Sequence, residues 1–129
     1  MPERETVRRA RRDKRQGKAP STQAGEFVRE EMEHIREGKH GARSTKQAIA
    51  IGLSKARRAG VRLRPPKKGS ATMRKQAARA YRQGQMHPRR KPSTTRSRAT
   101  KRALKREPRS AASKRALSAQ ARRAARSRT

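Results

Sequence analysis

The chain has 129 residues, of which 40 are Lys or Arg and nine are Asp or Glu, giving a formal net charge of +31 at pH 7. Only 29% of the residues are hydrophobic and 2% aromatic, which excludes a large core, and no apolar run approaches the length of a membrane span. The absence of cysteine excludes disulfides, thiolate metal sites and cysteine nucleophiles. A chain this basic repels itself, so we expect it to require a polyanionic partner.

The charge is unevenly distributed along the sequence. Residues 1–37 contain ten basic and eight acidic residues, whereas residues 38–129 contain 30 basic residues and a single acidic one, Glu107. Such asymmetry is typical of a binding arm attached to a folded part. Because low hydrophobicity with high net charge favours disorder, we expect a small helical island within a largely unfolded chain.

The N-terminal segment, residues 1–20, is predicted to be a basic arm with a frayed helix over about 2–17. Pro2 suits a first helical position, and Glu5 suits the positive end of the helix dipole. Gly17 is expected to end the helix. Its only sizeable apolar residue is Val7, so this helix has little to pack with and should form mainly in the bound state.

Residues 21–64 are predicted to fold as a helical hairpin, with helices at about 22–37 and 45–59. Apolar residues at spacings of three or four mark the first helix, and Ser44 with Gln47 forms a capping box before the second. The loop of residues 38–43 is short, which favours an antiparallel or steeply crossed pair. The expected core therefore places one set of side chains against another: Phe27, Val28, Met32 and Ile35 against Ile49, Ile51, Leu53 and Ala56.

The remainder is predicted to be a Pro-bounded basic helix within residues 65–86, followed by a disordered Arg/Lys/Ala-rich tail over residues 87–129. The helix, at about 71–83, should present Met73, Ala77, Ala80 and Tyr81 on one face. In the tail, like charges at i and i+4 oppose helix in water. The predicted fold class is therefore all-α, a small helical hairpin with further short helices and long, largely disordered basic arms.

The loop between the hairpin helices has two interpretations. The sequence Gly38-Lys39-His40-Gly41 matches the G-x-x-G loop of KH domains, but a KH domain needs a sheet and no strands are predicted, which favours a helix stop and turn. Lys39 and Arg43 could still hold a phosphate at the helix start. A helix-turn-helix, with residues 45–59 reading base edges, is the alternative to a hairpin that touches only phosphates, and we favour the latter.

The sequence predicts neither catalysis nor a metal or other cofactor. No Walker loop, nucleophile elbow, HExxH or paired-carboxylate motif is present, so no catalytic residue and no small-molecule substrate is expected. His34, His40 and His87 are too scattered in the sequence to predict a metal site, although His34 could be imagined as a ligand together with Glu30 or Glu37. We expect them to be surface histidines.

The Lys39-His40-Gly41 loop and the following residues 44–56, STKQAIAIGLSKA, resemble a family of small basic bacterial proteins. These share a helix, a Lys-His-Gly loop and a K-Q-A-I-A-I-[AG]-L-S-x-A helix, and are often described as DNA-binding. The resemblance covers residues 24–60, under a third of the chain, and implies DNA binding without defined chemistry. The tail is separately similar in composition to linker histones and bacterial histone-like proteins.

These observations predict a non-enzymatic, nucleoid-associated, histone-like protein of the cytoplasm, with DNA favoured over RNA and neither membrane nor small-molecule partners. Arginine outnumbers lysine 28 to 12, and arginine forks onto phosphate with two parallel hydrogen bonds. The alternatives are an RNA-binding or ribosome-associated protein, and a protein that condenses DNA inside a phage head or spore. The predicted phosphate-binding residues are Lys39, Arg43, Lys46, Lys55, Arg57, Arg58, Arg62, Arg64, Lys67, Lys68, Arg74, Lys75, Arg79, Arg82, Arg89, Arg90, Lys91, Lys101, Arg102, Lys105, Arg106, Lys114, Arg115, Arg122 and Arg123.

Overall fold

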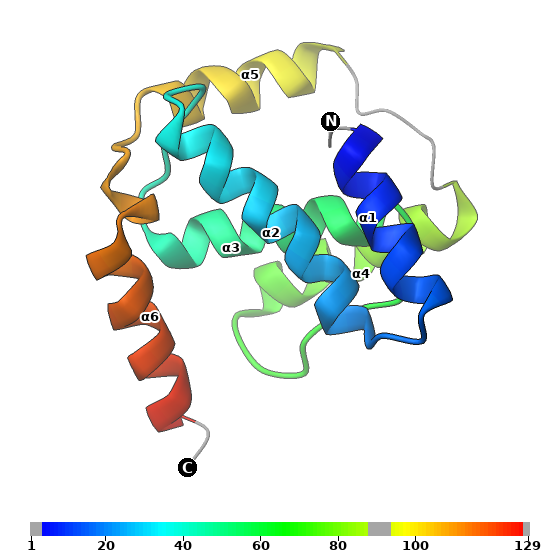
Figure 1. Ribbon diagram of the computed structural model, residues 1–129. Helices are drawn as coiled ribbons and strands as arrows, with labels where there is room; N and C mark the ends of the chain where they lie inside the picture. Colours follow the sequence, from blue (N-terminus) through cyan, green and yellow to red (C-terminus); the bar gives the residue numbers. More distant parts are fainter. Residues whose placement is uncertain (1–3, 88–93, 128–129) are drawn as a thin grey trace. The chain divides into compact units, whose positions relative to one another are not determined.

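A computed structural model describes residues 4–87 and 94–127, and it confirms the all-α class for these residues, which contain no strand (Figure 1). The helices are α1 (Arg4–Arg15), α2 (Pro20–Arg36), α3 (Thr45–Arg58), α4 (Ala71–Met86), α5 (Thr94–Lys105) and α6 (Lys114–Ser127), with a short 3-10 helix, η1 (Ser110–Ala112), before α6. In this part of the chain no helix is both long enough and apolar enough to cross a membrane.

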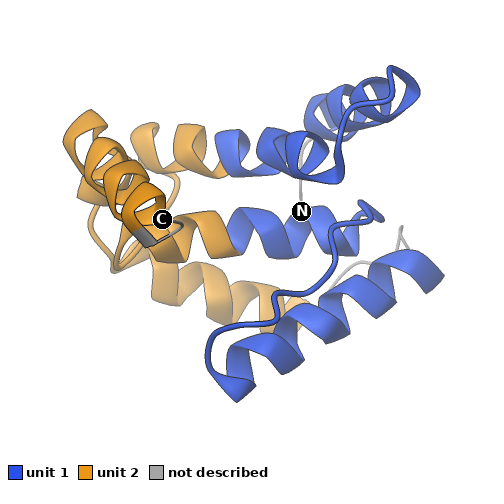
Figure 2. Ribbon diagram, turned by 90° about the horizontal axis from the view of Figure 1, so that it is seen from below, with its two compact units in different colours: residues 1–30, 51–91 blue, residues 31–50, 92–129 orange. Residues whose placement is uncertain are grey.

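The chain forms two compact units that are interleaved in sequence (Figure 2). Unit 1 consists of residues 1–30 and 51–91, and unit 2 of residues 31–50 and 92–129. Helices α2 and α3 each contribute residues to both units. Both units carry a large positive excess, with 23 basic and five acidic residues in unit 1 and 17 basic and four acidic residues in unit 2.

The core of unit 1 confirms the predicted contact between the two hairpin helices. Phe27 is fully buried and clusters with Ala24 from α2 and Ala56 from α3. Gly52 lies so close to Val28 that a Cβ on the glycine would come within 2.7 Å of the Val28 Cα. Burial of Phe27 contributes on the order of 2 kcal/mol, which is a large share of what so small a core can supply.

The prediction that the N-terminal segment is a frayed arm is wrong, because α1 packs into unit 1. Ala10 is buried in the same cluster as Phe27, with Val7 partly buried beside it. Thr6 and Asp13 are also buried, so the packed face follows the helical spacing of four and three. This face is made of small and polar side chains, which a search for large apolar residues does not detect.

Helix α4 packs through small residues rather than through the large ones on its predicted face. Ala77 and Ala80 are buried as expected, but Met73 is exposed and lies near Gly69, while Gly84 takes the third buried position. A Cβ on Gly84 would overlap the Arg57 carbonyl oxygen, so only glycine allows this approach of α4 to the end of α3.

In unit 2 the predicted disordered tail is replaced by α5, η1 and α6, so this expectation is wrong for residues 94–127. The backbone N–H of Gly41 donates to the Leu104 carbonyl at 2.8 Å, and that of Ala42 donates to Pro108 at 3.0 Å. Ala111 and Ala112 are buried, together with Ile35 from α2. Like charges at i and i+4 on α5 and α6 oppose helix, but the contacts between residues distant in sequence, which local sequence does not reveal, hold this part of the chain in place.

Candidate nucleic-acid interface

In unit 1, a set of exposed cations without acidic residues between them lies on α4 and the segment that precedes it. The helix begins at Ser70, whose hydroxyl accepts the Met73 N–H at 3.1 Å. Four cations of α4 fall within less than half of its circumference, opposite the buried Ala77 and Gly84. The set is exposed and is named here the α4 cationic face. It consists of Arg62, Arg64, Lys67, Lys68, Arg74, Lys75, Arg79 and Arg82.

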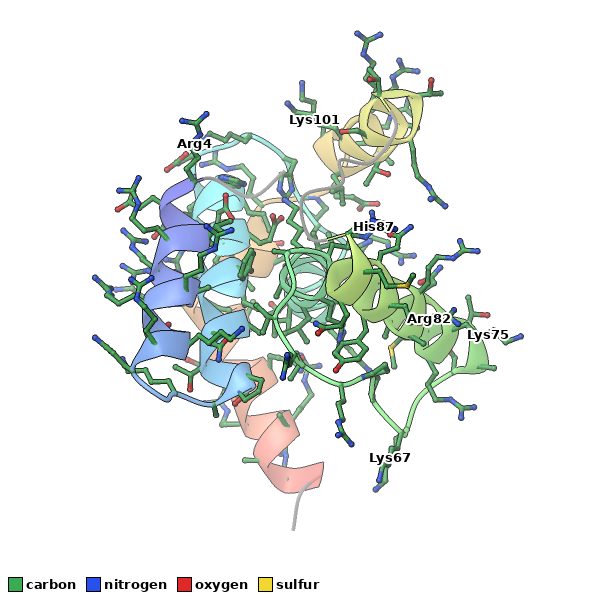
Figure 3. All side chains as sticks on the ribbon, turned by 90° about the vertical axis from the view of Figure 1, so that its right-hand side faces the viewer. Arg4, Lys67, Lys75, Arg82, His87 and Lys101 are labelled. Atoms are coloured by element: carbon green, nitrogen blue, oxygen red, sulfur yellow. The ribbon has the colours of Figure 1, made fainter. Side chains whose placement is uncertain are left out.

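The α4 cationic face has no acidic residue near it in sequence. From residue 38 to residue 106 the chain contains neither Asp nor Glu. In Figure 3, Lys67 and Lys75 extend away from the ribbon on this side of unit 1. Charges of one sign gathered on one surface add their fields, which raises the local concentration of anions around them.

Three predicted binding residues on α3 differ from this set in their surroundings. Arg57 is buried, with only 7% of its surface exposed, and it donates to the carbonyl oxygens of Leu63 and Arg64 at 3.0 and 3.3 Å. Burial lowers the pKa of the Arg57 guanidinium below its usual value. Lys55 and Arg58 are half-buried and take part in interactions within the protein. Arg57 thus holds the chain after α3 and is not available to a ligand.

Helix α1 contributes a second group of exposed cations that the sequence reasoning missed. Arg9 pairs with Glu5 at 2.6 Å, and Lys18 lies 3.6 Å from the buried Asp13, so part of the charge is neutralised locally. The other basic residues of the helix are exposed: Arg4, Arg8, Arg11, Arg12, Lys14 and Arg15. A signal was present, because Thr6, Ala10 and Asp13 alternate with these cations at helical spacing.

A cleft of about 260 Å³ in unit 1 has an apolar wall and a cationic rim. Val7, Phe27 and Val61 are among its apolar lining residues, and Arg11, Lys14 and Arg62 line it as well. No acidic residue lines the cleft. It therefore brings cations of α1 together with the first residue of the α4 cationic face, two groups that are about 50 residues apart in sequence.

In unit 2, backbone N–H groups at the start of α3 that could bind a phosphate already donate to side chains of the protein. Lys39, Arg43 and Lys46 are exposed, and Lys39 lies 3.2 Å from Glu37. The predicted capping pair is present, because the Gln47 N–H donates to the Ser44 hydroxyl at 3.1 Å. The Gln47 side chain in turn accepts the Arg43 N–H at 2.6 Å. These amides are satisfied within the protein, which leaves fewer of them to hold a phosphate at this helix end.

The described residues after 93 include the remaining predicted residues, all at exposed positions: Lys101, Arg102, Lys105, Arg106, Lys114, Arg115, Arg122 and Arg123. Arg109, which was not predicted, donates instead to the carbonyl oxygens of Ile35 and Arg36 at the end of α2. Arg36 donates to the Ala112 carbonyl at 3.1 Å. These two arginines therefore hold unit 2 together. Arg89, Arg90 and Lys91 lie outside the described residues.

The expectation that the histidines are scattered is wrong for two of them. In unit 2, His34 and His40 converge with Glu31, and one ligand atom from each lies within 4.8 Å of the others. His87 stands apart as the exposed residue that follows α4 in unit 1. The loop after Gly38 brings His40 back to α2, which sequence spacing alone could not reveal.

Residues 4–68 of the chain match the family of unknown function DUF6496. The chain belongs to this family. The DUF6496 match spans α1, α2 and α3 and ends at Lys68, before α4 begins. No curated protein and no solved structure matches the chain.

Membership of DUF6496 places the candidate residues in two groups. Arg62, Arg64, Lys67 and Lys68 lie within the matched segment, whereas the cations of α4, α5 and α6 lie beyond it. The histidine and glutamate cluster also lies within the matched segment. Because the family carries no assigned function, the function of this member has to be inferred from its own charge and geometry.

Proposed function

We propose that this protein binds nucleic acid, with duplex DNA favoured over RNA, through phosphate contacts that carry little sequence information. It acts by binding and not by catalysis, in the manner of a nucleoid-associated, histone-like protein of the bacterial cytoplasm. The observation that carries the proposal is the α4 cationic face, eight exposed cations in a stretch without acidic residues.

The dimensions of α4 suit contact with a duplex. A helix of 16 residues is about 24 Å long, and duplex DNA presents about 14 phosphate charges over that length. The cations of α4 therefore meet an excess of phosphates in any sequence. Release of condensed counterions then supplies most of the binding free energy, which makes the affinity strongly dependent on salt.

The placement of the aromatic residues favours a duplex over single-stranded RNA. Recognition of single strands relies on bases that stack on exposed aromatic side chains. The sequence holds one phenylalanine and one tyrosine and lacks tryptophan; Phe27 is fully buried and Tyr81 is half-buried. The surface thus offers many charge contacts and few stacking contacts.

The test is a salt titration of binding to a fluorescent DNA duplex, with two matched variants of α4. If all eight cations of the α4 cationic face contact phosphates, the plot of log affinity against log salt should have a slope of about −7 from this face alone. Replacement of Arg74, Lys75, Arg79 and Arg82 by glutamine should make the slope shallower by about 3 to 4. Replacement of the three arginines by lysine retains the charge and should leave the slope nearly unchanged.

Three outcomes would contradict the proposal. The first is an affinity that barely responds to salt, and the second is a glutamine variant whose slope equals that of the native chain. The third is preferential binding to structured RNA of equal length and charge, which would favour the ribosome-associated alternative. A second duplex of unrelated sequence should bind with similar affinity, since phosphate contacts carry no sequence information.

A further inference from the structure

The cluster of Glu31, His34 and His40 in unit 2 is a set of metal-ligating side chains with no part in the proposed phosphate contacts. Glu31 and His34 are three residues apart on α2 and therefore share one face of the helix. Their arrangement is a Glu-x-x-His pair of the kind that supplies metal ligands in helical bundles. We propose that these three side chains bind a zinc ion.

The loop after α2 supplies the third ligand. Gly38 adopts a positive φ of 80°, and the Lys39 N–H donates back to the His34 carbonyl at 3.0 Å. This turn reverses the chain and places His40 beside the helix that it has just left. The His40 Nε2 lies 3.1 Å from the Glu31 carboxylate oxygen. The rings of His34 and His40 are arranged edge to face, with their centroids 6.2 Å apart.

The orientation of the His40 ring directs its Nε2 toward the glutamate. Its Nδ1 lies 2.9 Å from the Gly41 carbonyl oxygen, which can only accept, so Nδ1 carries a proton. The other ring nitrogen, Nε2, faces the Glu31 carboxylate oxygen and is the nitrogen that can ligate a metal. A zinc ion between them would be bound by both atoms. A hydrogen bond from the far nitrogen to a backbone carbonyl is also what commonly orients a metal-bound histidine.

The donor set suits zinc, and so does the distance between the ligand atoms of His40 and Glu31. Two imidazole nitrogens with one carboxylate oxygen form a donor set that zinc uses, as do other transition metals such as iron(II), whereas calcium and magnesium prefer oxygen ligands alone. Zinc bonds of about 2.0–2.1 Å place neighbouring ligand atoms of a tetrahedron about 3.3 Å apart, close to the 3.1 Å between His40 and Glu31. The Glu31 side chain is almost fully buried and that of His40 is 9% exposed, so the ion would be shielded from water on this side.

The zinc site would stabilise the contact between the loop of residues 38–43 and the C-terminal segment of unit 2. Gly41 and Ala42, directly after His40, donate to the carbonyl oxygens of Leu104 and Pro108. An ion that fixes His40 therefore also fixes the two amides that hold the end of α5. Its role is structural, and it is independent of whether the α4 cationic face binds DNA.

The experiment is a zinc competition titration of the full chain, stripped with a chelator, against a chromogenic zinc indicator. We expect one tightly bound zinc per chain. His34→Gln and His40→Gln should each weaken binding at least about tenfold, the loss seen when even an outer-shell partner of a metal site is removed. His87→Gln removes the exposed histidine of unit 1 and should leave the affinity unchanged.

Amide exchange supplies a second readout that does not depend on the indicator. Zinc should slow exchange at Gly41 and Ala42 in the native chain and in His87→Gln, but not in His40→Gln. His34 is half-buried, so its variant tests the site even if a Glu31→Gln chain does not fold. The proposal is overturned if no stoichiometric zinc binds, or if His87→Gln weakens binding as much as His40→Gln does.

Discussion

Arg57 and Arg62 are the same residue type and lie five positions apart, yet one is buried and the other is exposed. Arg57 is buried and donates to two backbone carbonyls, whereas Arg62 is exposed at the rim of the cleft. Sequence spacing gave both as phosphate ligands. What separates them is the path of residues 61–64, which turns back over Arg57, and that path depends on tertiary packing.

Substitution of two helical glycines by alanine should change the free energy of unfolding in opposite directions. Gly84→Ala should lower the free energy of unfolding by about 2 kcal/mol or more, because the new Cβ overlaps the Arg57 carbonyl. Gly25→Ala meets no atom within 4 Å and should raise it by about 0.5–1 kcal/mol through helix propensity. Urea unfolding of both variants is the measurement, and equal shifts would contradict this packing of α4.

Helices α2 and α3 were predictable because their large apolar side chains recur at helical spacing and Gly38 and Gly60 follow them. The capping pair of Ser44 and Gln47 was predictable because the two residue types are three positions apart in sequence, just before an apolar stretch. Helices α1, α5 and α6 were not predicted to pack. Helix α1 buries only Thr6, Ala10 and Asp13, and the buried residues next to α6 are the alanines of η1, Ala111 and Ala112. Small and polar residues do not stand out in a search for large apolar side chains, and their partners lie far away in sequence.

The cap of α4 offers a test at the scale of one element. Ser70→Ala removes the hydroxyl that accepts the Met73 N–H, which should cost about 1 kcal/mol. Amide exchange in the first turn of α4 should accelerate correspondingly. Ser70→Asp retains an acceptor and favours the positive end of the helix dipole, so it should match or exceed the native stability. Faster exchange in the aspartate variant would contradict this account of the helix start.

At the scale of the whole molecule, the net charge of +31 should make stability and binding respond to salt in opposite directions. Raising ionic strength from 0.01 to 0.15 M shortens the Debye length from about 30 to about 8 Å. The thermal midpoint of the free protein should therefore rise, because self-repulsion is screened, while affinity for DNA falls. Calorimetry at several salt concentrations measures the first effect, and a midpoint that falls with salt would contradict it.

The interleaving of the two units has a consequence for synthesis on the ribosome. The polypeptide passes from one unit to the other three times, after residues 30, 50 and 91. Residues 31–50 emerge early, but the carbonyls that accept from Gly41 and Ala42 belong to Leu104 and Pro108, which emerge some 60 residues later. Unit 2 therefore cannot complete its fold during early translation, because residues 31–50 lack these hydrogen-bond acceptors until the C-terminal segment has been synthesised.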